Sequence, residues 1–228
     1  MTATGKGTLT RAAAVRFEGR GFTVVPGLFG YGEIARPCAE FAALHAAGPV
    51  PGHFAPDAAD PDPLRRRPRV MHPHELSPLA REFLLDARLR SVLEALFGEE
   101  VPAAQSAFYF KPPGTRGQAL YQDNFCLRVA CEPIDRGDGG LEVVPVDLAP
   151  GDVLFFNGGL VHGAGPNRSA DRLRRSFIGH YVGRSARRIG ARYRTLTMSG
   201  ARTRAAPDGE RHPGGAAPDH QRRRRERP

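Results

Sequence analysis

Cysteine is scarce in this 228-residue chain, and Cys38, Cys126 and Cys131 are spread too widely for a disulfide framework or a metal finger. The chain also lacks an apolar run long enough to cross a bilayer. The first ten residues contain Lys6 but no hydrophobic stretch after it, so we expect no signal peptide. These absences argue against a disulfide-rich secreted fold and a membrane-spanning protein, and they favour a cytoplasmic one.

Excess positive charge is absent from most of the chain. The net charge is +9, yet residues 184–228 contain 13 arginines against 4 acidic residues, and the remainder is neutral. A surface that binds phosphates needs basic charge in the folded part. We therefore expect no nucleic-acid partner and no membrane association. Binding of nucleic acid or an acidic partner through the "QRRRRERP" tail is the alternative, against the interpretation of this run as a solvated tail.

Hydrophobic spacing predicts helices first and strands later. Residues 22–25 are typical of a strand, 31–47 of a helix that begins near Pro37, and 76–97 of a helix interrupted at Asp86 and ended by Gly98. Short apolar segments bounded by Gly and Pro then predict five strands, within residues 104–114, 118–129, 139–145, 151–159 and 174–182. This order indicates an α+β fold with an antiparallel barrel or sandwich.

The composition divides the chain into three parts. Residues 1–14 are expected to be disordered, residues 15–199 to form one domain, and residues 200–228 to form a disordered basic tail. The tail consists largely of Gly, Pro, Ala and Arg, which cannot bury enough apolar surface to offset the entropy of ordering.

Three polar residues stand out in the strand-rich half. Asp123 lies in "YQDN", His162 in "GGLVHGAGPNRS" and Arg174 in "DRLRRSFIGHY". Taken singly, each has an ordinary interpretation: a turn carboxylate, a hydrogen-bonded histidine at a strand end, and a solvated arginine. Composition and spacing alone therefore indicate only an α+β domain.

A resemblance to a known family adds to this. The segments "FYFKPPGTRGQALYQDNFCLRV", "GGLEVVP" and "LAPGDVLFFNGGLVHGAGPNRSADRLRRSFIGHYV" resemble the phytanoyl-CoA dioxygenase family, as do "RGFTVVPGLF" and the helical segment that follows "PRVMHPH". The resemblance covers roughly residues 15–183. It implies a double-stranded β-helix, the jelly-roll or cupin-like barrel, behind N-terminal helices, and an Fe(II)- and 2-oxoglutarate-dependent dioxygenase that hydroxylates a small organic substrate with O2, ascorbate serving as a candidate reductant.

The family also implies roles for individual residues. Two histidines and a carboxylate hold Fe(II) on one face and leave the opposite positions open. Asp123 matches the carboxylate and His162 the distal histidine, whereas Arg174 and Lys111 match residues that bind 2-oxoglutarate. A guanidinium suits this role because it binds a carboxylate through two hydrogen bonds. Arg172 and Arg175 are close competitors for the place of Arg174.

The chain departs from the family pattern in two respects. Tyr121 stands where the first histidine ligand is expected, and a neutral phenol, with a pKa of about 10, is a poor ligand for Fe(II). We expect none of the other histidines, including His72, His74 and His180, to replace it. The segment between Asp123 and His162 is also shorter than in relatives, so the barrel is predicted to be incomplete and to lack a core strand. A catalytically inactive relative that binds a small molecule is therefore the alternative function.

Overall fold

The computed structural model describes residues 7–123, 143–186, 189–190 and 193–203. The helices are α1 (Arg11–Arg20), α2 (Tyr31–Ala47), α3 (Pro63–Arg66), α4 (Pro73–Leu76), α5 (Pro78–Leu84) and α6 (Ala87–Phe97). The strands are β1 (Phe22–Val25), β2 (Val70–Met71), β3 (Ala103–Lys111), β4 (Gln118–Tyr121), β5 (Val153–Phe156), β6 (His162–Ala164), β7 (Arg174–Tyr181), β8 (Thr195–Leu196) and β9 (Arg202–Thr203). No helix in these residues is long and apolar enough to cross a membrane.

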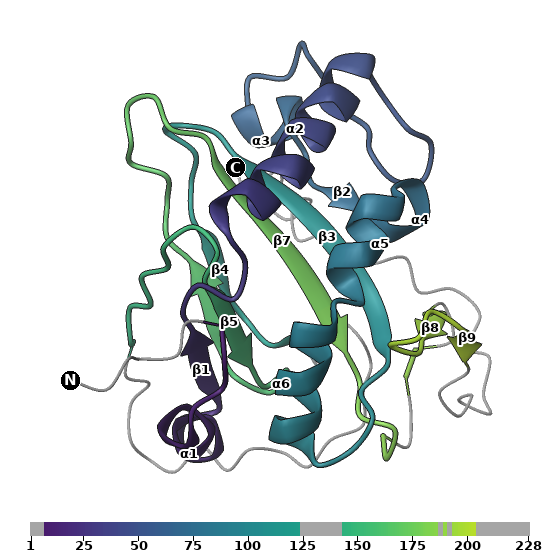
Figure 1. The fold of residues 1–228 in the computed structure, drawn as a ribbon. Helices are drawn as coiled ribbons and strands as arrows, with labels where there is room; N and C mark the ends of the chain where they lie inside the picture. Colours follow the sequence, from purple (N-terminus) through teal and green to yellow (C-terminus); the bar gives the residue numbers. More distant parts are fainter. Residues whose placement is uncertain (1–6, 124–142, 187–188, 191–192, 204–228) are drawn as a thin grey trace, which may run out of the picture.

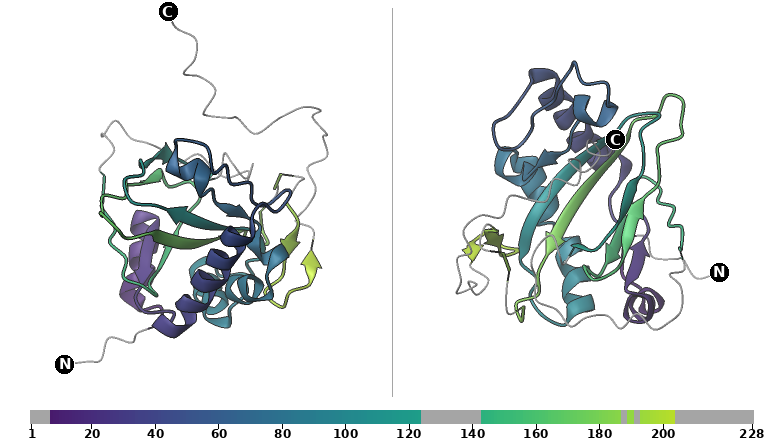
Figure 2. Two further views of the ribbon diagram at one scale, coloured as in Figure 1. Left: turned by 90° about the horizontal axis from the view of Figure 1, so that it is seen from above. Right: turned by 180° about the vertical axis from the view of Figure 1, so that it is seen from behind.

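Two layers of antiparallel strands face each other, with helices on one side. The long strands β3 and β7 pair along their length, and β2, β8 and β9 extend this sheet. The remaining strands form two antiparallel pairs, β1–β5 and β4–β6. Helices α2, α5 and α6 lie on one side of β3 and β7, and β4 lies on the other (Figures 1 and 2). The predicted α+β class is confirmed.

Alternation along β3 and β7 determines which side chains face the helices. Phe108 and Phe110 of β3 belong to a buried cluster with Phe41 of α2, and Phe177 of β7 packs against the same cluster. The Tyr181 hydroxyl donates a hydrogen bond of 2.6 Å to the carbonyl of Leu84. Because successive residues of a strand point to opposite faces, the even-numbered residues of β7 face the other strand layer.

The helical region forms largely as predicted. Asp86 interrupts it by accepting the Arg88 backbone N–H as the N-cap of α6, and Gly98 ends α6 with a positive φ of 70°. Helix α2 differs, since it begins at Tyr31 rather than near Pro37. The Glu33 carboxylate accepts the Gly30 backbone N–H at 2.7 Å and stabilises this earlier start. Pro37 lies inside the helix, where it removes a single backbone hydrogen bond.

Several predicted boundaries are wrong. Helix α1 begins at Arg11, within the segment expected to be disordered, because Thr10 caps it and Ala13 is buried. Strand β9 lies beyond residue 199, where it pairs with β8. Residues 143–145 form no strand, and Val143 and Val144 are 72% and 42% exposed, so no sheet face covers them. Several predictions lie outside the described residues. They concern the rest of that predicted strand, Cys126, Cys131, the segment within 124–142 where a strand was predicted to be missing, and the tail from residue 204.

Candidate functional site

Asp123 lies two residues beyond the end of β4, and its side chain is buried. The residue is 6% exposed, and its Oδ2 atom lies 3.7 Å from Nε2 of His162 and 3.5 Å from Nε2 of His180. No lysine or arginine of the described residues forms an ion pair with it. A buried carboxylate is costly unless a cation or hydrogen-bond donors compensate it. Asp123 therefore marks a place suited to a cation.

The ring of His162 is held in one orientation by its surroundings. Its Nδ1 lies 3.0 Å from the carbonyl oxygen of Leu160, and its ring centroid lies 4.3 Å from that of Tyr121 and 4.5 Å from that of Phe156. Because a carbonyl can only accept, Nδ1 carries the hydrogen. In the neutral ring Nε2 then presents a lone pair toward Asp123. A carbonyl partner of this kind is what a metal-ligating histidine usually has.

Tyr121 lies beside His162. It is the register partner of His162 across the β4–β6 pair, and its ring packs on the imidazole. Tyr121 and Asp123 are two residues apart, the spacing that places side chains on one face of an extended segment. The residue thus occupies the expected ligand position, but its phenol replaces the imidazole nitrogen with a weaker ligand.

Two basic side chains meet at one backbone carbonyl near this pair. Arg174 Nη2 and Lys111 Nζ donate hydrogen bonds of 2.9 Å and 3.2 Å to the carbonyl oxygen of Gly165. Burial, followed by the charges of Arg174 and Arg116, lowers the pKa of Lys111. Gly165 follows His162 by three residues, so at most about 10 Å of chain separates them. Two cations at one neutral acceptor form a suitable site for a carboxylate.

The register of β3 and β7 distinguishes Arg174 from its neighbour. Arg174 lies opposite Lys111, whereas Arg175 lies opposite Phe110, whose side chain packs with the helices. Residues directly opposite in an antiparallel pair share a face. Arg174 therefore lies on the face of His180, and Arg175 on the other. Arg172 is held differently, since its backbone carbonyl accepts from Asn167 Nδ2 at 2.7 Å.

His180 was expected from the sequence to lie outside the ligand set, yet its ring lies beside Asp123. It lies on β7 opposite Gln105, on the face that looks away from the helices. The signal available in the sequence was the alternation of β7, in which His180 shares a face with Arg174. Its Nδ1 is buried and has no hydrogen-bond partner among the described residues. The site thus collects side chains from both strand layers.

A second group of metal-type ligands lies apart from this site. One ligand atom each of His72, His74 and Glu75 lies within 4.8 Å of the others, at a pocket of about 240 Å³ that Arg194 also lines. The His74 ring is neutral, because burial lowers its pKa to about 4, and its Nδ1 lies 2.6 Å from the Ser106 hydroxyl. A guanidinium at the pocket opposes cation binding, so we interpret this group as structural.

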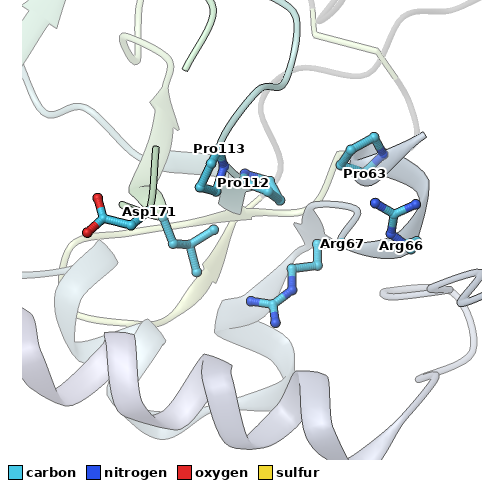
Figure 3. Close-up of a pocket in the computed structure, with 7 residues that line it drawn as sticks. Pro63, Arg66, Arg67, Pro112, Pro113 and Asp171 are labelled. Carbon is cyan, nitrogen blue, oxygen red and sulfur yellow. The ribbon is translucent and has the colours of Figure 1, made fainter. Parts of the chain in front are cut away.

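A larger surface pocket of about 350 Å³ lies where β3 ends and β7 begins (Figure 3). Pro112 and Pro113 after β3, Arg66 and Arg67 at the end of α3, and Asp171 before β7 line it. Lys111 and Arg174 adjoin this pocket in sequence without lining it. The pocket therefore opens at the end of the sheet that carries the basic pair.

Part of the chain is similar in sequence to known proteins. The family model for phytanoyl-CoA dioxygenase (PhyH) matches residues 132–176, a segment that includes His162 and Arg174. A curated relative, Dioxygenase FrzG from Cladobotryum sp, is 39% identical over 49 residues, which are 22% of this chain and 16% of that protein. Both matches cover about a fifth of the chain and show a similarity to the phytanoyl-CoA dioxygenase family over that segment. Because the match spans about a sixth of the relative's length, it transfers no activity.

Several solved structures share the fold of this chain. The non-heme alpha ketoglutarate dependent epimerase SnoN from nogalamycin biosynthesis has a TM-score of 0.60 at 21% identity, over 77% of this chain and 83% of that one. EctD from S. alaskensis with bound Fe has a TM-score of 0.61 at 20% identity, over 82% and 80%. HygX from Streptomyces hygroscopicus, with nickel and 2-oxoglutarate bound, has a TM-score of 0.56 at 18% identity, over 77% and 88%. The cupin-like, jelly-roll fold is thereby confirmed.

Proposed function

We propose that this protein is an Fe(II)- and 2-oxoglutarate-dependent oxygenase that hydroxylates a small organic substrate. The observation that carries the proposal is the buried Asp123 carboxylate, 3.7 Å from the Nε2 atom of His162. Carboxylate and imidazole are the ligands that ferrous iron takes in such enzymes. When bound, Fe(II) with 2-oxoglutarate and O2 would supply the oxidising chemistry for attack on a C–H bond.

The chain's own residues would hold and orient the reactants. Asp123 would neutralise part of the metal's charge, and His162 would bind through the nitrogen that Leu160 leaves free of hydrogen. Arg174, with Lys111 beside it, would bind the distal carboxylate of 2-oxoglutarate in place of the Gly165 carbonyl. The rings of Tyr121 and Phe156 would shield the His162 side of the site from water.

A catalytically inactive relative that binds a small molecule is the second candidate. Tyr121 favours it, because one carboxylate and one imidazole alone would hold iron weakly. The basic pair at Gly165 would still bind a dicarboxylate without iron. The two candidates differ in whether binding of 2-oxoglutarate depends on metal and in whether it is followed by turnover.

The test is succinate formation. The protein and its Tyr121→His variant are purified without oxygen and given Fe(II), ascorbate and 2-oxoglutarate, and succinate is measured with and without air. Oxygen-dependent succinate from the unmodified protein is the expected result. If neither protein forms succinate at saturating iron, while 2-oxoglutarate raises the melting temperature without metal, the second candidate is correct.

A further inference from the structure

We infer that His180 is the third metal ligand of this chain, in place of the histidine that Tyr121 has replaced. The inference rests on the proposed function, since it assigns a ligand to the same metal. It reverses the expectation from the sequence that no other histidine takes this role. The starting observation is that His180 Nε2 lies 3.5 Å from the Asp123 carboxylate, nearer than His162 Nε2 at 3.7 Å.

The distances to Asp123 suit ligands of one ion. Two ligand atoms, each about 2.1 Å from a metal and separated by 90–110°, lie about 3.0–3.4 Å apart. The Asp123 Oδ2 atom lies 3.7 Å from His162 Nε2 and 3.5 Å from His180 Nε2. Both separations exceed a good hydrogen bond and are close to the spacing of two ligands on one metal. Each imidazole thus lies at nearly the distance from the Asp123 carboxylate that a shared ion requires.

The two histidines must approach each other when they bind. Among the described residues, the group of three whose ligand atoms all lie within 4.8 Å of one another is His72, His74 and Glu75. Asp123, His162 and His180 do not form such a group, although each histidine lies within 4.8 Å of Asp123. The ligand nitrogens of the two histidines are therefore more than 4.8 Å apart. Two ligands on opposite sides of one ion are at most about 4.2 Å apart. A small movement of one ring is therefore required.

His180 is the ring that would move. A hydrogen bond to Leu160 holds Nδ1 of His162, whereas Nδ1 of His180 has no partner in the described part of the chain. The same missing partner predicts a weaker site, because loss of the hydrogen bond behind a ligating histidine typically lowers metal affinity about 10–100-fold. The Tyr121→His variant should accordingly bind metal more tightly than the natural chain.

A structural role for His180 is the competing explanation. In that role its Nε2–H would orient Asp123 without touching metal, and glutamine, which also carries an N–H donor, would preserve much of the function. A ligand role makes a different prediction, because a glutamine amide ligates only through its carbonyl oxygen, a weaker donor than imidazole that changes the ligand-field spectrum. It also predicts that His180 becomes dispensable once residue 121 is histidine.

The experiment measures Co(II) binding without oxygen, by equilibrium dialysis and by the visible ligand-field spectrum. The variants are His180→Gln, His180→Ala, Tyr121→His and the double variant Tyr121→His/His180→Ala, with His45→Ala as the control for a histidine outside the site. Thermal unfolding of each metal-free protein establishes that it is folded. We expect both His180 variants to weaken binding more than about 100-fold, with a changed spectrum, and the double variant to recover the affinity.

Three results would overturn the inference. The first is unchanged affinity and spectrum in His180→Gln, which would assign His180 a positioning role. The second is a natural chain that binds no Co(II) while Tyr121→His does. The third is a double variant as weak as His180→Ala. In the first and third of these the natural chain still binds metal, so the proposed function survives, whereas a natural chain that binds no metal, as in the second, would also remove the proposed function.

Discussion

Replacing Arg174 by glutamine should weaken binding of 2-oxoglutarate, and replacing Arg175 should not. Arg174 shares its face with Lys111 and donates to the Gly165 carbonyl at 2.9 Å, whereas Arg175 lies opposite Phe110 on the helix side. The two arginines are adjacent in sequence and both are exposed, so comparing the two variants tests whether the face of the strand decides the effect on binding.

The expected magnitude follows from the geometry. A hydrogen bond between charged groups contributes about 1.5–3 kcal/mol. Solvent screens the exposed Arg174, and Lys111 remains beside it, so the lower part of that range applies. This corresponds to a rise of about 10–30-fold in Kd for Arg174→Gln. Arg175→Gln should remain within about twofold.

Isothermal titration calorimetry with 2-oxoglutarate, in the presence of Fe(II) and without oxygen, measures this Kd. Repeating the titration at higher ionic strength gives a second observable, because the contribution of an exposed guanidinium decreases as salt rises. Equal losses in the two variants would refute the argument from register. An unchanged Kd in Arg174→Gln would remove Arg174 from the site, with Arg172 the remaining competitor.

Two predictions concern stability. Burial lowers the pKa of His74 from 6.5 to about 4, so between these pH values the unfolded chain binds a proton that the folded chain does not. The free energy of unfolding therefore falls as the pH is lowered from 6.5, and by pH 4 about 3 kcal/mol has been lost. Urea unfolding of His74→Gln should show a correspondingly flatter dependence on pH, and an equal slope in both proteins would contradict the assignment. Gly151→Ala should destabilise by more than about 2 kcal/mol, because φ is +93° and the new Cβ would overlap the Phe29 carbonyl oxygen. Gly114→Ala, with φ of +72° and open space, should cost about 1 kcal/mol in the same thermal melts, and equal losses would show that the overlap with Phe29 is relieved.

The sequence predicts the parts of the fold that local chemistry determines. Strand β1 ends at Val25, directly before Pro26, and α6 has its N-cap Asp86 and its terminating Gly98 where the sequence predicted them. The three-residue strand β6 was not predicted, because "HGA" has no hydrophobic alternation and forms a strand through its pairing with β4. The two-residue strands β2, β8 and β9 were missed for the same reason, since pairing depends on residues distant in the chain.

In the candidate site, too, some features could be predicted from the sequence, whereas contacts between distant residues could not. Asp123, His162, Arg174 and Lys111 were chosen from a family pattern, and the structure brings the first two together and the last two together. The contact between His180 and Asp123 could not be predicted from spacing, because it joins the two strand layers across 57 positions of sequence. Alternation gives the face of His180 but not its distance from another sheet.

The loss of histidine at position 121 leaves the main energetic demand of the site unchanged. Asp123 is buried whichever residue occupies position 121, and a buried carboxylate continues to favour a nearby cation. His162 keeps its orientation through the Leu160 carbonyl and two aromatic rings, one of which Tyr121 itself supplies. Under the proposed function, tyrosine at this position would thus remove one ligand while preserving the charge of Asp123 and the orientation of His162. Retention of the metal would then depend on His180, a third nitrogen on the opposite strand layer whose Nδ1 has no competing hydrogen bond among the described residues.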